Sequence, residues 1–154
     1  MRLLTIFLLA CSAWGQATPS TPPANWYGAG GSWNGQAAGW ASYAHLLSSS
    51  QQIYSFTTWD ITRTKANPYV TSSARTGLAM VFRTIGPVTI LGLTTAGVAT
   101  SSTSTSGSFS GGGLGVIKIA NTSWTVLLGA RVDKSSATQT GSQMVYEIGM
   151  GRTW

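Results

Sequence analysis

Ionisable side chains are few, and they limit the chemistry that this chain can perform. Charged residues make up 8% of the 154 residues, and the chain has one histidine, His45. A serine hydrolase needs a histidine base on which a serine and an acid converge, so His45 would have to be that base. A lone histidine with a few dispersed acids does not predict a metal site. We therefore expect no catalytic residue, no metal and no cofactor.

The more informative charges alternate with apolar residues. Arg131 and Asp133 do so in residues 124–133, and Glu147 does so in residues 143–154. Successive side chains of a strand point to opposite faces, so these charges lie opposite the apolar side chains. If the two stretches form a hairpin, Arg131 and Glu147 are near neighbours, and Asp60 and Arg75 have the same relation in an earlier hairpin. A buried charge must be paired, so all five residues are predicted to form ion pairs.

The elements that position these charges are strands, and the last one is the most distinctive. Residues 143–154 read QMVYEIGMGRTW, in which Met144, Tyr146, Ile148 and Met150 alternate with small or polar residues. This stretch resembles the closing strand of bacterial outer-membrane β-barrels, which carries alternating apolar residues and a terminal aromatic that the barrel-assembly machinery reads. Arg152 departs from the pattern, because that position usually holds another apolar residue.

The resemblance implies an all-β fold: an eight-stranded antiparallel transmembrane β-barrel connected as an up-and-down meander. Eight is the smallest number of strands in such barrels. Alternation and turn residues divide the chain accordingly. The predicted strands are Asn25–Trp33, Ala37–Leu46, Gln52–Thr62, Ser72–Arg83, Val88–Ala99, Phe109–Ile119, Trp124–Asp133 and Gln143–Trp154.

The composition agrees with a membrane wall. Soluble domains contain roughly 25% charged residues, far more than this chain, which is instead rich in Gly, Ser and Thr. Lipid on one side and a packed polar lumen on the other would suit this mixture. The net charge of +6 comes from scattered Lys and Arg residues without a basic patch, so we expect no nucleic acid partner. After the N-terminal segment, no apolar run is long enough to predict a transmembrane helix.

The N-terminus has the pattern of an export signal. Residues 1–17 are predicted to be a signal peptide, residues 18–24 a proline-rich linker and residues 25–154 the barrel domain. Residues 8–11 (LLAC) also resemble a lipoprotein cleavage site, which would make Cys11 a lipidated residue. The predicted location is the bacterial outer membrane, with both ends of the barrel domain in the periplasm.

Aromatic and basic residues indicate how the barrel contacts lipid. Interfacial girdles are predicted from the tryptophans, with Trp26, Trp124 and Trp154 at the periplasmic ends of their strands and Trp33 and Trp59 at the outer ends. Arg63, Lys65 and Lys134 fall in predicted outer loops, where they could contact lipopolysaccharide phosphates. The expected partners are outer-membrane lipid, lipopolysaccharide and, through the C-terminal strand, the barrel-assembly machinery.

Three functions fit this sequence. The first is a structural, adhesive or narrow-pore barrel with its lumen plugged by ion pairs, since eight strands leave a lumen that side chains can fill. The second is a secreted soluble β-sandwich or lipocalin-like binding module. The third is a lipid A-modifying barrel enzyme. Lipid A deacylases of similar size have their histidine and serine two residues apart late in the chain, whereas His45 is early and precedes Leu46 and Leu47.

Overall fold

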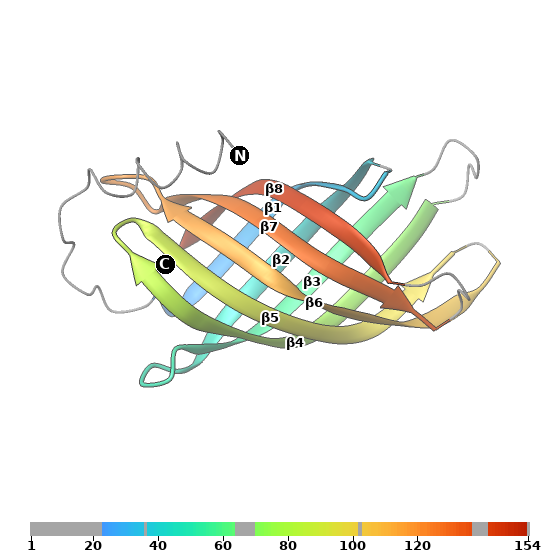
Figure 1. The fold of residues 1–154 in the computed structure, drawn as a ribbon, viewed down its shortest axis with the longest axis horizontal. Coiled ribbons are helices and arrows are strands. Elements are labelled where there is room, and N and C mark those ends of the chain that lie inside the picture. Colours follow the sequence, from blue (N-terminus) through green and yellow to red (C-terminus); the bar gives the residue numbers. More distant parts are fainter. Residues whose placement is uncertain (1–22, 36, 64–69, 102, 137–141, 154) are drawn as a thin grey trace.

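The computed structural model contains eight β-strands (Figure 1). It describes residues 23–35, 37–63, 70–101, 103–136 and 142–153, so the predicted signal peptide, Cys11, Lys65 and Trp154 lie outside the described residues. Among the residues described, no helix is long and apolar enough to cross a membrane. The strands are β1 (Asn25–Trp33), β2 (Ala37–Ser48), β3 (Ile53–Arg63), β4 (Val70–Ile85), β5 (Val88–Thr100), β6 (Thr105–Lys118), β7 (Trp124–Ser135) and β8 (Gln143–Thr153).

The strands form one closed antiparallel barrel in which each strand pairs with its neighbours in the sequence. β8 closes the barrel on β1, in a register that runs from Trp26 opposite Thr153 to Trp33 opposite Tyr146. We call the end that holds Asn25 and Thr153 the terminal end, and the opposite end the loop end. The predicted eight-stranded meander is therefore confirmed, and a β-sandwich is excluded because the sheet has no open edge.

Turn residues explain where the strands reverse. Gly35 and Gly86 have φ angles of 95° and 55°, and Asn121 has a φ of 59°. Glycine and asparagine tolerate this left-handed region best, which makes them the preferred residues of tight hairpin turns. All three residues lie between strands that the sequence predicted.

Several strands extend further than the alternation indicated. β6 begins at Thr105, although residues 100–107 were expected to form a loop because of their low complexity. Thr105 and Ser106 pair with Thr100 and Ala99 of β5, so their backbone groups are satisfied by a neighbouring strand. Threonine is also favoured in strands. Likewise, β7 continues to Ser135 and includes Lys134, which the sequence placed in a loop.

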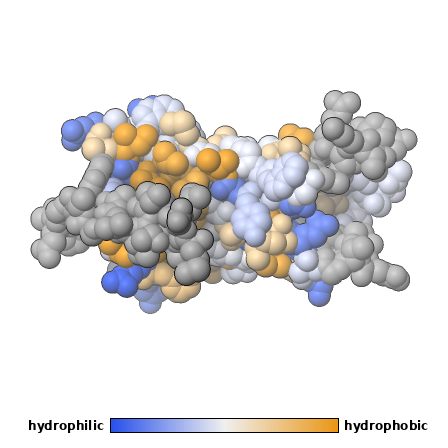
Figure 2. Space-filling model, turned by 45° about the horizontal axis from the view of Figure 1, so that its top comes forward, coloured by the Kyte–Doolittle hydropathy of each residue, from blue (hydrophilic) through white to orange (hydrophobic). Residues whose placement is uncertain are grey.

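The large apolar side chains point out of the barrel. Ile148, Tyr146 and Phe82 are among the most exposed, at 62%, 60% and 68%. Hydrophobic residues gather over the flank of the barrel, most densely toward the terminal end, on the left in Figure 2. A soluble lipocalin-like module keeps its apolar residues inside, so this distribution contradicts that alternative and suits a wall that faces lipid.

One strand changes face near its end. Strict alternation along β4 would place Arg83 on the inward face with Ala79 and Val81, but Arg83 is exposed and pairs with the outward-facing Ile90. The register between β4 and β5 shifts between Val81 and Arg83. A bulge of this kind inserts one extra residue, which moves the following side chains to the other face.

The lumen is not polar throughout, which corrects the sequence prediction. It contains a cluster of buried apolar side chains, most of which lie toward the terminal end. Trp26 stacks on Phe56 with ring centroids 6.0 Å apart and an interplanar angle of 22°. Eight strands leave a lumen just wide enough for side chains to fill, and here aromatic rings fill part of it. The buried cluster consists of Trp26, Trp40, Ala44, Tyr54, Phe56, Ala79, Leu114 and Leu127.

Candidate functional site: a charged cluster in the barrel lumen

The structure brings together the five charged residues that the sequence placed inside. Asp60 lies on β3, Arg75 on β4, Arg131 and Asp133 on β7, and Glu147 on β8. Alternation turns each of them inward, because the residues on either side of each one face outward. We call these five residues the lumen cluster.

Arg131 is the centre of the lumen cluster. Its guanidinium contacts three carboxylates: Nη2 lies 2.7 Å from Oδ1 of Asp60, Nε lies 2.8 Å from Oδ1 of Asp133, and Nη1 bonds to Oε1 of Glu147. The side chain is 7% exposed. A guanidinium can make several such charge-assisted bonds because its five N–H donors lie in a rigid plane.

Arg75 completes a closed ring of ion pairs. It bonds through Nη2 to Asp60, and its Nη1 lies 3.1 Å from Oδ1 of Asp133. Asp60 and Asp133 are therefore each shared by Arg75 and Arg131. The Ser73 hydroxyl adds a bond of 3.1 Å to Oδ2 of Asp60. Sharing matters energetically, because each guanidinium is held by more than one carboxylate inside a low-dielectric lumen.

The lumen cluster lies on the loop-end side of the apolar cluster. Asp133 is its most exposed acid, with 25% of the side chain accessible, whereas Asp60 and Glu147 are below 10%. A cavity of only ≈ 10 Å³ lies between the two clusters, bordered by Trp40, Leu114 and Arg131. Charged and aromatic side chains thus fill successive layers of the described lumen.

The comparisons with known proteins agree on the fold. No known family model and no curated protein sequence matches this chain. Three solved structures of transmembrane barrels are similar over most of the chain. The chain has the fold of the eight-stranded outer-membrane β-barrels.

The similarity to these outer-membrane barrels is structural, since sequence identity is low in every case. Neisserial surface protein A (NspA) matches with a TM-score of 0.56 and 12% identity, covering 84% of this chain and 95% of NspA. The outer membrane protein Ail of Yersinia pestis matches with a TM-score of 0.54 and 14% identity, covering 86% and 100%. A de novo designed transmembrane β-barrel matches with a TM-score of 0.52 and 9% identity, covering 86% and 98%.

Trp26 is not a girdle residue of this barrel, contrary to the sequence prediction. It is 5% exposed and packs inside the lumen against Phe56. Along β1 it shares a face with Gly28 and Ser32, both inward, while the next residue, Tyr27, points outward and is exposed. Small residues on the inward face leave the space that an indole ring needs.

Other predicted girdle residues do face outward. At the loop end, Trp33 and Trp59 are exposed, and the outward-facing Tyr146 lies opposite Trp33 in the β1–β8 register. At the terminal end, Trp124 is exposed on the outer face. Two outward tyrosines that sequence reasoning missed, Tyr27 and Tyr43, pair with each other near this end. Their alternation with inward-facing residues on β1 and β2 was the available signal.

Arg152 occupies an outward position at the terminal end of β8. Its guanidinium lies 5.9 Å from the centre of the Trp124 ring, and Nε donates to the Ser123 hydroxyl at 2.9 Å. A cation stacked on an interfacial tryptophan can stay in contact with water and lipid headgroups. The departure from the apolar pattern of outer-membrane barrels therefore falls where a charge is tolerated.

Two of the three basic residues predicted to contact lipopolysaccharide lie in described strands, toward the loop end. Lys134 is exposed on the outward face of β7 and lies opposite Phe109 of β6. Arg63 is the last residue of β3, and its side chain is outside the described residues, as is Lys65. Of these three side chains, the structure thus describes that of Lys134, which is accessible on the outer wall.

His45 lies on the exposed side of β2 near the terminal end. Its Nδ1 is 2.8 Å from Oδ1 of Asn25, which also accepts a bond of 2.9 Å from the Tyr43 hydroxyl. A hydrolase would use an acid to orient the imidazole, and the neutral amide of Asn25 does not stabilise an imidazolium ion in that way. In the described part of the chain, no group of His, Cys, Asp and Glu side chains is arranged to hold a metal.

Proposed function

We propose that this protein is an outer-membrane β-barrel of structural or adhesive type whose lumen is closed by the lumen cluster. The observation that carries the proposal is that the charged residues meet inside the barrel while the large apolar residues cover its outer wall. Lipid accounts for the apolar wall, and pairing accounts for the buried charges. The structural similarity to NspA and Ail supports this proposal at the level of the fold.

Closure of the lumen rests on two layers of side chains. Arg131 links Asp60 on one wall to Asp133 and Glu147 on the other. Beneath this layer, Trp26, Trp40 and Leu127 are buried. Ions cross a pore only where they stay hydrated, or where polar groups replace their hydration shell, along the whole path. A closed lumen favours the structural or adhesive type over the narrow pore.

Bilayer recording tests this closure directly. The purified protein, inserted into a planar bilayer, should show no steady conductance. Arg131→Ala removes the residue that contacts three carboxylates and should produce occasional current events, while Lys134→Ala on the outer wall should stay silent. A steady open channel in the unaltered protein would contradict the proposal.

Location in the outer membrane is a further part of the proposal. It rests on the apolar outer wall and on the predicted signal peptide at residues 1–17. We expect the protein in the outer-membrane fraction of its host, extracted only by detergent and migrating faster on unboiled gels than after boiling. Release by osmotic shock in soluble form would contradict it.

Assembly of the barrel is a separate part of the proposal. We expect the barrel-assembly machinery to recognise β8, so deletion of Trp154 should lower the amount of folded barrel.

Contact with lipopolysaccharide is proposed at Lys134. A groove of ≈ 600 Å³ on the outer wall is bordered by Leu78, Phe109, Val132 and Lys134. An acyl chain suits the apolar part of this groove, and a phosphate suits the ammonium group at its end. Lys134→Gln should reduce the lipopolysaccharide that copurifies with the protein, whereas Arg83→Gln, on the outer wall near the terminal end, should not. Arg63 and Lys65 are proposed to contribute to the same contact.

A further inference from the structure

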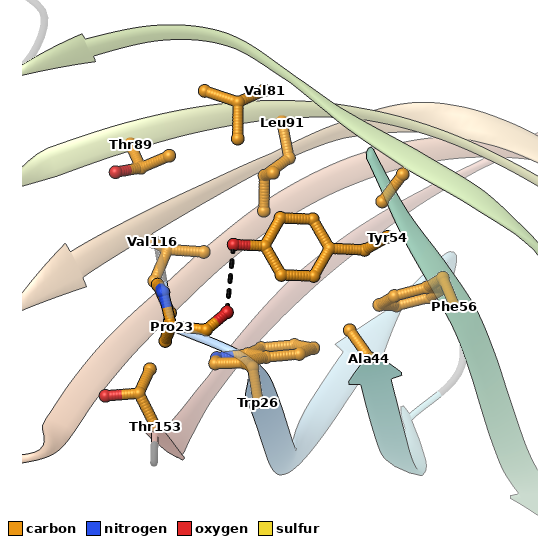
Figure 3. Close-up of a pocket in the computed structure, with 11 residues that line it drawn as sticks. Pro23, Trp26, Ala44, Tyr54, Phe56, Val81, Thr89, Leu91, Val116 and Thr153 are labelled. Carbon is orange, nitrogen blue, oxygen red and sulfur yellow. Dashed lines mark hydrogen bonds between the residues drawn. The ribbon is translucent and has the colours of Figure 1, made fainter. Parts of the chain in front are cut away.

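The terminal half of the lumen contains an apolar cavity that the proposed function does not use (Figure 3). Its volume is ≈ 80 Å³, and its lining comes from several strands of the barrel. The walls include Trp26, Ala44, Tyr54, Phe56, Leu91 and Val116. The indole of Trp26 and the ring of Phe56 form one side, and the aliphatic side chains of β5 and β6 form another.

This cavity is suited to a hydrocarbon group. An apolar cavity does not hold water well and accepts small apolar ligands, because its lining atoms otherwise lack contact partners on one side. The walls belong to hydrogen-bonded strands of a closed sheet, so the cavity is preformed and little ordering accompanies binding. A space of ≈ 80 Å³ between aromatic and aliphatic walls holds the last few carbons of an unbranched alkyl chain.

The opening of the cavity faces the terminal end of the barrel. Thr89 and Thr153, which border it, are near the terminal ends of β5 and β8. Pro23 also borders it, and its carbonyl oxygen accepts a bond of 3.2 Å from the Tyr54 hydroxyl. The N-terminal entry of the chain therefore lies beside the mouth, and the polar atoms are confined to this side.

A cation lies at the same end. Lys118 follows Val116 on the same face of β6, is exposed, and ends the strand. It pairs with the inward-facing Thr125, so its side chain leaves the backbone toward the mouth of the lumen. An apolar cavity with an exposed ammonium group at its mouth is complementary to a molecule with a hydrocarbon tail and a negative head.

We propose that this cavity binds the end of a single-chain anionic amphiphile, with the terminal carbons of the alkyl chain between Trp26, Phe56 and Leu91, the rest of the chain in the mouth and the head group beside Lys118. A fatty acid carboxylate and the phosphate of an anionic lysophospholipid share this chemistry. The inference goes beyond the proposed function, and it holds whether or not the protein is adhesive.

Photo-crosslinking tests the site. The protein is reconstituted in nanodiscs of zwitterionic phosphatidylcholine and titrated with dodecanoate that carries a diazirine at the end of its chain. The expected result is saturable labelling of Trp26, Phe56 or Leu91, located by mass spectrometry and displaced by unlabelled dodecanoate. Labelling confined to outward residues such as Phe82 and Ile90 would overturn the proposal.

A matched pair of variants separates the cavity from the outer wall. Ala44→Leu fills the cavity, and Ala41→Leu adds the same atoms on the exposed face of β2. Lumen labelling should fall at least about tenfold in Ala44→Leu and stay unchanged in Ala41→Leu. The gel shift of unboiled samples verifies that both variants fold, and Ala79→Val is the replacement if Ala44→Leu does not. Equal labelling of a folded cavity-filled variant and of Ala41→Leu would overturn the site.

Lys118→Gln tests the head group. This substitution removes the ammonium group that would form a charge-assisted bond with the anion, so the affinity for dodecanoate should fall about tenfold while that for dodecanol is unchanged. Competition by an anionic lysophospholipid, compared with dodecanoate, distinguishes the two sources of the ligand. If Lys118→Gln changes both affinities equally or neither, the anionic part of the proposal is wrong.

Discussion

Arg131 on β7 donates through Nη2 to Oδ1 of Asp60 on β3 at 2.7 Å, and this bond crosses the lumen of the barrel. On one side β4, β5 and β6 separate the two strands, and on the other side β8, β1 and β2 do so. The bond therefore joins opposite walls. The lumen cluster thus connects two opposite walls of the barrel through a contact that no hairpin supplies.

Asp60→Ala should destabilise the barrel strongly. Asp60 is bonded to both Arg75 and Arg131, and Arg75 is almost fully buried. Removal of Asp60 takes one carboxylate from each buried guanidinium, which leaves charged N–H donors without an acceptor in the lumen and costs roughly 1–3 kcal/mol. Urea unfolding followed by tryptophan fluorescence in detergent measures the loss. Asp133→Ala, at the more exposed edge of the lumen cluster, is the control and should cost less; equal losses would show that burial does not set the cost.

A second change should restore part of the stability that Arg131→Met removes. Without Arg131, the acids Asp60, Asp133 and Glu147 face Arg75 as the remaining cation of the lumen cluster. Replacing Glu147 by Leu in the Arg131→Met variant then removes a carboxylate that has lost its bonding partner. We expect a favourable coupling energy of about 1–3 kcal/mol in the double-mutant cycle, measured by the same unfolding assay. Additive losses would contradict the pairing.

The sequence predicted the ion pairs of the lumen cluster that lie within hairpins, but not those that join distant strands. Alternation within two hairpins placed Asp60 near Arg75 and Arg131 near Glu147, and both pairs are bonded. The bonds of Arg131 to Asp60 and of Arg75 to Asp133 depend on how the closed sheet staggers its strands. That stagger is a property of all eight strands together, and no short stretch of sequence encodes it.

The tryptophans show a second limit. Trp26 is near a strand end, as a girdle residue should be, yet it faces the lumen. Position along a strand sets the depth in the membrane, but the phase of alternation sets the face. On β1 the phase was visible, because Trp26 shares its face with Gly28, Gly30 and Ser32, whereas Tyr27 and Trp33 share the other. The prediction for Trp26 was wrong because it used the position along the strand and not the face to which the side chain points.

Trp26→Ala should therefore be far more destabilising than Trp33→Ala. Trp26 is 5% exposed and stacks on Phe56, whereas Trp33 is 57% exposed on the outer wall. Truncating a buried tryptophan costs about 3–5 kcal/mol, because the packing around the ring disappears and a cavity remains. Thermal unfolding, followed by the gel shift of samples heated to increasing temperature, measures the difference. A comparable loss in both variants would place Trp26 outside the lumen.

Quenching by brominated lipid should distinguish the same two faces. Single-tryptophan variants that retain only Trp33 or only Trp124 carry an indole on the outer wall, where bromine on the acyl chains of phosphatidylcholine can reach it. A variant that retains only Trp40, which is buried in the lumen and donates to the carbonyl of Gly31 at 3.0 Å, should be quenched much less. Equal quenching of all three would contradict the assignment of faces.

Gly149→Ala tests how closely β8 packs against its neighbours. A Cβ atom at Gly149 would lie 2.4 Å from the carbonyl oxygen of Ala29 and 2.6 Å from Cζ2 of Trp40. Neither atom can move freely, since one is strand backbone and the other belongs to a buried ring. We expect a loss of about 1–3 kcal/mol in urea unfolding, typical of overpacking. Gly31→Ala is the matched control, because the nearest atom to its added Cβ is 3.7 Å away and a less flexible unfolded chain favours folding. If both alanine variants are equally stable, β8 packs less closely against Ala29 and Trp40 than the structure indicates.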